Sequence, residues 1–526
     1  MISSRYHILP GAGGATRSTL IHQRLWEHCQ HLIMRIIFGQ EKRSKAKTRT
    51  VGAVEALLLM LEWHPNAIHF PPASDGWDSD LLLTTSDRRD PPSGNTADWR
   101  PSDESRAKWL EEVVTPARMS DRMSWMLLGC AQTLAHELGV CDASGSNNDI
   151  NSNNITDSAS QSDRHLRISK MLFIFVEQLS FRLGCPSTVP SSLTRCATEP
   201  CTDSRQSAFL IGWVELTNLL RTVSDVLFPS GMTIRQLLAS SRYVNVIKHF
   251  QQQLLSWKTL HLREENLEAA AFRDLSIEFH CLRSLVNSLG IQAVVERANG
   301  KRSGINTSSD HTNSSDLQTL QLSLRPTDFE FIQEVVDGCC QLLQTVNGMA
   351  ELGLLRFCPV RTFLRIITAS ILLLKALSLG SHTTNLQASL GILEETIRVL
   401  RLSSLDDMHL ASRYAALLDR HLITFRQSLV PSSVPRGISL SGDFGMNTTP
   451  WDTSHEHGDI LHSASGDEAG NTFGGSSDFQ TPSDWLSLPF DPAMAPFGFT
   501  DMEGLDFGMI GDSDRRAWDF LWNLPG

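Results

Sequence analysis

Apolar residues recur at helical spacing along most of the chain, and one stretch shows the pattern most clearly. Between Arg164 and Pro186, apolar residues follow one another at intervals of four, three, four and four, at Ile168, Leu172, Phe175, Leu179 and Leu183. That is the period of one buried helix face. Gly184 comes directly afterwards and predicts an abrupt end of the helix. The stretch is therefore predicted to be a helix that packs along one side into a core.

The same period predicts helices over most of the chain before residue 430. Besides Arg164–Pro186, they are expected near residues 16–38, 51–63, 121–138, 206–228, 233–260, 267–298, 327–350, 360–379, 384–402 and 406–428. Pro326, followed by Thr327 and Glu330, predicts a capping box where one of them begins. No alternating apolar and polar run bounded by turn residues indicates a strand. The predicted fold class is all-α.

Composition divides the chain into a helical body and polar segments. Residues 1–16, with three closely spaced glycines, are predicted to be disordered, and residues 17–429 are predicted to form one large helical domain. Two polar insertions, at about residues 142–163 and 299–320, have too few apolar side chains to offset the entropy of ordering. The segment 187–204 is rich in Ser, Thr and Pro and contains Cys196 and Cys201 without a partner pair for a metal site. Residues 430–526 are predicted to be a disordered tail.

The acidity of the chain is concentrated in that tail. The formal net charge is −12, and residues 437–526 contain fifteen Asp or Glu against two Arg. Bulky aromatic residues are interleaved with the acidic ones, among them Trp485, Phe490, Phe507, Trp518, Phe520 and Trp522. Charge repulsion keeps such a segment extended while its aromatic groups remain accessible to a partner groove. The pattern is typical of a transactivation region that binds coactivators; a disordered terminus without a partner is the alternative.

A short basic cluster lies between the first two predicted helices. It consists of Lys42, Arg43, Lys45, Lys47 and Arg49. Clusters of this kind often direct nuclear import or contact phosphate groups. A solvated connection between two helices would have the same composition, and the residues favour neither interpretation. The cluster is too short to be a DNA-binding element by itself.

Cysteine usage and hydropathy indicate the cellular environment of the chain. The ten cysteines include no Cys-x-x-Cys pair, and no secretory signal precedes them, so they are expected to be thiols in a reducing compartment. The most apolar run lies between Arg365 and Lys375 and is far shorter than the roughly 20 residues that cross a bilayer. The sequence therefore predicts a soluble intracellular protein that does not enter a membrane.

Catalytic and metal-binding motifs are not evident. Cys185 and Cys141 are candidate nucleophiles, and His136 is a candidate base. The sequence contains no Gly-x-Ser-x-Gly elbow, phosphate-binding Gly loop, dinucleotide fingerprint or metal-ligand pair. The chain is accordingly predicted not to be an enzyme and to hold no cofactor or metal ion.

Three blocks in order resemble the middle homology region of fungal zinc-cluster transcription factors. They are the helix Val51–Trp63, the segment from Trp125 to Gly139 (WMLLGCAQTLAHELG) and the stretch Arg164–Pro186. The third block departs from the family pattern, with Glu177 and Gln178 in place of an Asp-Arg pair and Cys185 in place of the last Arg. Within the family, LWEHCQHLIMRI, EALLLMLEWHP and SDGWDSD are most similar to activators of secreted-protease genes.

The resemblance implies a nuclear regulator of RNA polymerase II genes, an activator of protease genes that serve protein and nitrogen utilisation, and a homodimer at promoter DNA. Family members bind two zinc ions through six N-terminal cysteines and read DNA there. Cys29 is the only cysteine before residue 130, so no DNA-binding or zinc-ligating residue is transferred to this sequence. The alternative is a helical adaptor or truncated paralogue that acts by dimerising with a full-length factor. The resemblance does not identify what the middle domain senses.

Overall fold

The computed structural model describes residues 1–7, 9–40, 47–64, 115–141, 155–199, 204–227, 231–305, 323–379, 383–405 and 409–429. Every regular element in these ranges is helical, which confirms the all-α prediction. The elements are α1 (Ile2–Tyr6), α2 (Gly14–Ile37), α3 (Val51–Glu62), α6 (Thr115–Glu137), α7 (Ile155–Leu183), α8 (Ser191–Thr198), α9 (Ser204–Leu227), α10 (Gly231–Ala239), α11 (Tyr243–His261), α12 (Ala269–Ile305), α14 (Pro326–Glu351), the 3-10 turn η3 (Leu355–Phe357), α15 (Val360–Ser378), α16 (Thr383–Leu402) and α17 (Leu410–Leu429).

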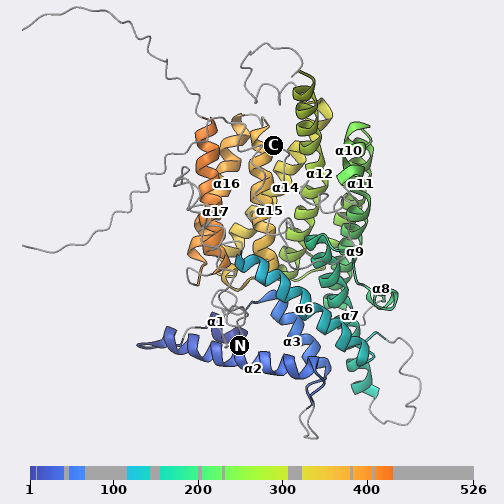
Figure 1. Ribbon diagram of the computed structural model, residues 1–526, viewed down its shortest axis with the longest axis vertical. Coiled ribbons are helices and arrows are strands. Elements are labelled where there is room, and N and C mark those ends of the chain that lie inside the picture. Colours follow the sequence, from blue (N-terminus) through green and yellow to red (C-terminus); the bar gives the residue numbers. More distant parts are fainter. Residues whose placement is uncertain are drawn as a thin grey trace, which may run out of the picture.

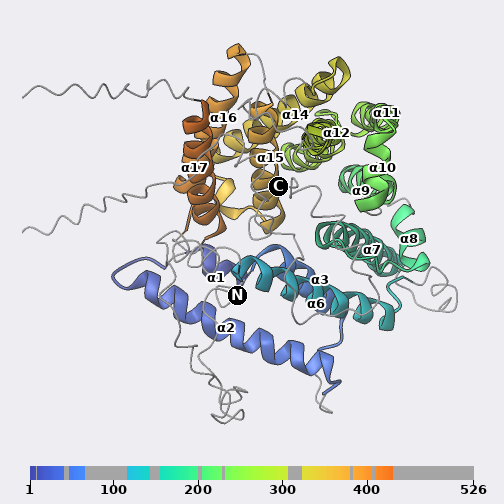
Figure 2. The same cartoon turned by 45° about the horizontal axis from the view of Figure 1, so that its top comes forward.

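The helices form an upright bundle and a second group that crosses its lower end (Figure 1). In the bundle, α12 packs along α14, which also packs against α15 and α16, while α17 covers α15 and α16. The crossing group contains α2, α3, α6 and α7, and Figure 2 shows α2 at its outer edge. Helix α3 packs on α6, and α7 joins this group to the bundle through α9. The arrangement brings α3, α6 and α7 against the starts of α12 and α15.

Helix α7 contains the apolar stripe from which its helix was predicted. Ile168, Leu172, Phe175, Leu179 and Leu183 are all at most 8% exposed. Gly184 follows with φ of 63°, a left-handed conformation that favours glycine, and ends the helix as its position predicted. The pattern therefore identified both the buried face and the end of this helix.

The predicted disorder of residues 1–16 is wrong where the structure describes them. Residues Ile2–Tyr6 form α1, and α2 already begins at Gly14. Ser4 Oγ lies 3.3 Å from His22 Nδ1, and the Arg5 guanidinium donates to the carbonyl oxygen of His64 at 2.5 Å. These contacts hold α1 against α2 and the end of α3. The partners are distant in sequence, so the local sequence does not reveal them.

Two further segments differ from the predicted pattern. The Ser/Thr/Pro-rich segment 187–204 contains the short helix α8, for which no helix was predicted; it buries Leu193, Cys196 and Ala197 and therefore has an apolar face. Buried Lys170 donates to the carbonyl oxygens of Ala197 and Glu199, both at 2.5 Å, at the end of that helix. The helix predicted at 233–260 is divided into α10 and α11 at Ser241, whose φ is 57°.

Several helix ends also differ from their predicted positions. Helix α7 begins at Ile155, inside the predicted insertion 142–163, and α12 continues to Ile305, inside the predicted insertion 299–320. The rest of both insertions lies outside the described residues. At the start of α14, Asp328 replaces Glu330 as the capping carboxylate: it accepts from the Arg325 backbone N–H at 3.2 Å. Pro326 is the first residue of α14, one position earlier than predicted.

Candidate functional site where the crossing helices meet the bundle

The arginines that flank the apolar stripe of α7 form structural ion pairs. Arg164 donates two hydrogen bonds to the Glu55 carboxylate in α3, at 2.8 and 2.6 Å. Arg182 is paired with Asp121 of α6 at 2.5 Å, and both side chains are 13% exposed. These arginines hold α7 against α3 and α6, so they serve packing rather than a nucleic-acid surface.

Two more arginines enter the same region from the start of α15. Arg361 and Arg365 are four residues apart and therefore share one face of the helix. Arg361 is paired with Glu62 at the end of α3 and lies 3.4 Å from Asp274 of α12. Arg365 donates through Nε and Nη2 to Glu278 of α12, at 3.1 and 3.0 Å. Helices α3, α12 and α15 are thus joined by charged pairs that are mostly removed from water.

An aromatic ring packs against the Arg361 guanidinium group. The Arg361 guanidinium carbon lies 4.7 Å from the centre of the Trp213 ring of α9. Phe175 of α7 meets the same Trp213 ring edge-on, with ring centres 6.0 Å apart and planes 80° apart. The stacking geometry favours a delocalised cation over this ring. Arg361 therefore contacts α3, α9 and α12 at once.

Two of the three positions at which the sequence departs from the family pattern, Glu177 and Gln178, also lie in this polar region. Glu177 is buried, accepts a hydrogen bond from Ser187 Oγ at 2.9 Å and lies 3.3 Å from Arg221. Gln178 donates to Glu278 at 3.3 Å and so adds a neutral donor beside the Arg365 pair. Replacing an acid–base pair by Glu177 and Gln178 therefore leaves α7 bonded to α9 and α12.

Burial shifts the proton affinity of the carboxylates in this region. It raises the pKa of Glu62, although the Arg361 charge acts in the opposite direction. It also raises the pKa of Asp121, to about 6, and the pKa of Asp274. Desolvation favours the neutral acid, whereas a neighbouring guanidinium favours the carboxylate. The nearby arginine charges therefore oppose the effect of burial and favour the ionised carboxylates.

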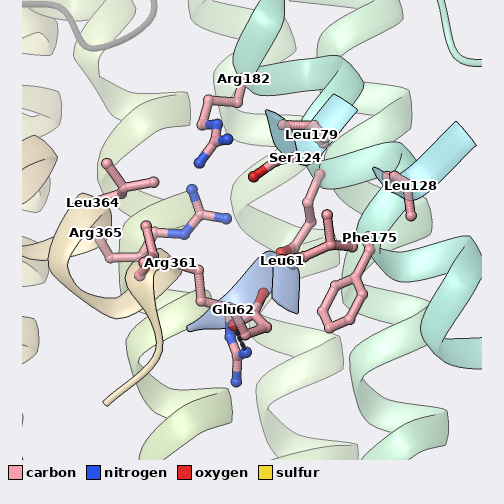
Figure 3. Close-up of a pocket in the computed structure, with 12 residues that line it drawn as sticks. Leu61, Glu62, Ser124, Leu128, Phe175, Leu179, Arg182, Arg361, Leu364 and Arg365 are labelled. Atoms are coloured by element: carbon pink, nitrogen blue, oxygen red, sulfur yellow. Dashed lines mark hydrogen bonds and ion pairs between the residues drawn. The ribbon is translucent and has the colours of Figure 1, made fainter. Parts of the chain in front are cut away.

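A cavity of about 50 Å³ lies between these charged groups. Its walls are formed by Leu61, Glu62, Ser124, Leu128, Phe175, Gln178, Leu179, Arg182, Val360, Arg361, Leu364 and Arg365. In Figure 3, the guanidinium groups of Arg182 and Arg365 point toward one another on one side, and Arg361 is bonded to Glu62 on the other. The space accommodates a few water molecules or one small polar group. One wall of the cavity carries hydrogen-bond donors, and the opposite wall is apolar.

The residues singled out from the sequence lie elsewhere or outside the described ranges. Arg49 is paired with Glu137, donating at 2.6 Å through Nε, and it also donates to the Ile36 carbonyl oxygen at 2.6 Å. Lys47 precedes α3, while Lys42, Arg43 and Lys45 are outside the described residues. The tail residues Trp485, Phe490, Phe507, Trp518, Phe520 and Trp522 are outside them as well.

Of the candidate nucleophiles, Cys141 is buried and Cys185 is half-buried. The Cys185 thiol donates to the Leu183 carbonyl oxygen, and burial raises its pKa. Cys141 Sγ lies 3.9 Å from Ser169 Oγ. The raised pKa keeps the Cys185 thiol protonated at neutral pH. Within the described ranges, no group of three or more His, Cys, Asp or Glu residues is placed to hold a metal ion.

The sequence interpretation missed the polar region around α15. Residues 360–379 were predicted as an apolar helix, and their arginines only as end charges. The informative signal is that Arg361 and Arg365 share one face at the start of a helix that is otherwise mostly apolar. Their partners Glu62, Asp274 and Glu278 are distant in sequence, so no local pattern predicted the pairing.

No helix in the described part of the chain is long and apolar enough to span a membrane.

The chain is similar to transcription factor hmgR of Aspergillus fumigatus over its whole length. The two are 40% identical over 540 aligned residues, which cover 100% of this chain and 69% of hmgR. No family model matches the sequence, and no solved structure matches it. Identity at this level over the complete helical body and tail shows common descent and a role in transcription regulation. The chain belongs to the family of fungal transcription factors that includes hmgR.

Proposed function

We propose that this chain is a transcriptional activator in which the helical body regulates and the acidic tail activates. The observation that carries the proposal is the composition of residues 430–526, where acidic and aromatic residues alternate in a chain related over its whole length to a transcription factor. Acidic residues keep the segment solvated, and the aromatic side chains supply the apolar contacts to a coactivator groove. The aromatic residues Trp485, Phe490, Phe507, Trp518, Phe520 and Trp522 are the proposed contact points.

A reporter assay tests the tail directly. Residues 430–526 are fused to an unrelated DNA-binding domain, and transcription of a reporter is compared with that of the bare domain. We expect strong activation, and a loss of most of it when the six aromatic residues are replaced by alanine. The matched control replaces six serines of the same tail by alanine and should retain activity. Activation no higher than that of the bare domain refutes this role for the tail.

The basic cluster is proposed to direct nuclear import. Arg49 holds the end of the cluster to the body through Glu137 and Ile36, so the import signal is assigned chiefly to Lys42, Arg43, Lys45 and Lys47. A fluorescent fusion of the full chain should accumulate in the nucleus, and replacement of Lys42, Arg43 and Lys45 by alanine should reduce that accumulation. A solvated surface pair such as Arg398 and Glu395 offers a control substitution. Unchanged nuclear signal in the triple variant contradicts the assignment.

Promoter contact and target genes belong to the same proposal through the family resemblance. The chain is proposed to act as a homodimer at promoters of secreted-protease genes; the alternative is an adaptor that reaches DNA by dimerising with another factor. Chromatin immunoprecipitation of the tagged chain, together with protease transcript levels in a deletion strain, tests the target genes. Light scattering of the purified chain distinguishes a homodimer from a monomer. Promoter occupancy that depends on a second factor favours the adaptor.

A further inference from the structure

Helix α2 has a second face, largely in contact with solvent, that combines apolar and basic side chains. Its buried side consists of Gly14, Ser18, His22, Trp26 and Ile36, and Figure 2 shows the helix along the outer edge of the molecule. Another set of residues follows at intervals of four, three, four, four and three, which places them on one face of the helix. They are Arg17, Ile21, Arg24, His28, Leu32 and Arg35, which we call the outer face of α2.

The apolar side chains on and beside the outer face are exposed to water. Ile21 is 43% exposed, and Leu25, one turn beyond it, is 39% exposed. The end of the helix is similar, because Met34, Ile37 and Phe38 are exposed as well. Contiguous exposed apolar groups mark places where another surface binds, since contact with water is unfavourable for them. The exposure of α2 therefore favours a partner with apolar side chains.

The charge of α2 limits the chemistry of that partner. Arg17 and Arg35 each donate a hydrogen bond to a backbone carbonyl oxygen at 3.2 Å, which does not neutralise their charge. Among the described residues, no carboxylate is paired with either of them or with Arg24. Glu27 is the one acidic residue of α2, and it accepts a hydrogen bond from Gln23. A face with uncompensated cations favours an acidic partner.

A segment of the same chain has both properties. Residues 478–507 contain six Asp or Glu and no Lys or Arg, together with aromatic residues such as Trp485 and Phe490. They lie outside the described residues. A second copy of α2 would bring arginines against arginines, which repel. A nucleic-acid backbone would supply negative charge but leave the apolar side chains of the outer face in water. The acidic aromatic segment therefore matches this face best.

The length of the chain allows this contact within one molecule. Helix α17 ends at Leu429, and residues 430–484 lead from there into the acidic aromatic segment. A Gly- and Ser-rich chain of that length spans roughly 40 Å on average and at most roughly 180 Å. A compact domain the size of residues 1–429 has a radius of gyration of about 22 Å. The segment can therefore reach any side of the helical body.

We propose that the outer face of α2 binds residues 478–507 of its own chain, with their carboxylates against the three arginines and their aromatic side chains over Ile21 and Leu25. Linkage within one chain gives the segment a high effective concentration, so a weak contact is sufficient. Bound residues are withheld from any other partner. That consequence for activation rests on the proposed function of the tail, whereas the contact itself does not.

Photocross-linking in the full chain tests the contact. In one protein p-benzoylphenylalanine replaces Leu25 of α2, and in the control it replaces Leu255, which is 61% exposed in α11. Irradiation should join position 25 to residues 478–507 at least fivefold more often than position 255. In a mixture of isotopically light and heavy chains, the cross-links should form within one chain. Equal yields from the two positions, or light and heavy chains joined at random, overturn the proposal.

Charge variants test the role of the arginines. Arg24→Glu reverses one exposed charge of the outer face and should lower the cross-linking yield at position 25 at least fivefold. Lys248→Glu makes the same change of charge at an exposed position of α11 and should leave the yield unchanged. About 0.5 M salt should lower the yield of the unaltered pair, because it screens exposed charges. A yield that Arg24→Glu does not lower more than the control variant overturns the proposal.

Tail variants test the role of the aromatic residues without altering α2. Trp485→Ala/Phe490→Ala retains every carboxylate and should lower the yield at position 25 at least fivefold. Ser483→Ala/Ser487→Ala is the matched control and should leave it unchanged. An undiminished yield without the two aromatic side chains means that charge alone attracts the tail, and it overturns the proposal. The reporter fusion of the tail lacks α2, so failure of the contact and failure of the activating role give different results.

Discussion

Replacing Arg361 by methionine should separate α15 from α3 and lower the stability of the whole body. Arg361 is paired with Glu62, and the two side chains are 16% and 10% exposed. Removing one partner of a buried pair leaves the other charge without compensation, which costs about 3–5 kcal/mol. Loss of the contact with the Trp213 ring adds about 0.5–2 kcal/mol, since this cation is largely desolvated. Methionine preserves much of the side-chain volume, so a cavity contributes little.

The pH dependence of this effect identifies its cause. Burial raises the pKa of Glu62 in the folded protein, and the Arg361 charge partly opposes that increase. Without Arg361 the folded-state pKa rises further above the unfolded value. A group with a raised folded-state pKa contributes stability at low pH and loses that contribution as the pH rises through the folded-state pKa. Arg361→Met should therefore be more destabilising at about pH 8 than at about pH 5.

Urea denaturation followed by far-ultraviolet circular dichroism measures the change, as a shift in midpoint at equal slope. The double variant Glu62→Gln/Arg361→Met should recover about 1 kcal/mol or more relative to the sum of the single variants. Arg401→Met is the matched control, because its partner Asp419 is exposed and such surface pairs contribute at most about 1 kcal/mol. A destabilisation by Arg361→Met no larger than that of the control, or no coupling to Glu62, would refute the reasoning.

Four further substitutions test other parts of the fold. A Cβ at Gly290 would lie 2.8 Å from Phe331 Cβ, so Gly290→Ala should disturb the packing of α12 on α14 and lower the unfolding free energy by about 1–3 kcal/mol. At Gly348 in α14 an added Cβ meets open space, so Gly348→Ala should raise the unfolding free energy by about 0.5–1 kcal/mol. Tyr243→Phe removes a hydroxyl bonded to buried Asp328 and to Arg297, and should lower the unfolding free energy by about 1.5–3 kcal/mol, with no change in far-ultraviolet spectrum. Burial raises the pKa of Asp121 from 3.8 to about 6. The stability that Asp121 contributes, on the order of 3 kcal/mol, is therefore present below its unfolded-state pKa and is lost as the pH rises through about 6. Asp121→Asn should abolish that part of the pH dependence of the unfolding free energy, and parallel pH profiles for the two proteins would contradict the prediction.

The sequence predicted those features that a single helix determines by itself. The stripe from Ile168 to Leu183 is a local property, because each residue shares a face with the next. The end at Gly184 is local for the same reason, since its positive φ follows from the missing side chain. Hydrophobic periodicity therefore identified the fold class and most of the helices.

Features that depend on distant partners were not predictable in this way. Helix α1 has five residues, and its side chains are hydrogen-bonded to His22 and to the carbonyl oxygen of His64, both distant in sequence. Helix α8 is rich in Ser and Thr and follows Pro190, so its composition indicates a loop until Lys170 is seen to bind its last carbonyls. The candidate site has the same character. Its arginines and carboxylates come from helices up to 299 residues apart, and only the packing brings them together.

The charged region around Arg361 also has a mechanical consequence. Helix α3 meets α15 through the Arg361–Glu62 pair, and α7 meets α12 through the hydrogen bond from Gln178 to Glu278. Ion pairs also join α15 to α12, beside the apolar core that these helices share with α14. Ion pairs with raised carboxylate pKa values are close to balance between attraction and desolvation, so a single added or removed charge alters them more than it alters an apolar contact. A regulator needs an interface that a small chemical change can strengthen or weaken without unfolding its core. The charged pairs where α3, α12 and α15 meet have that character.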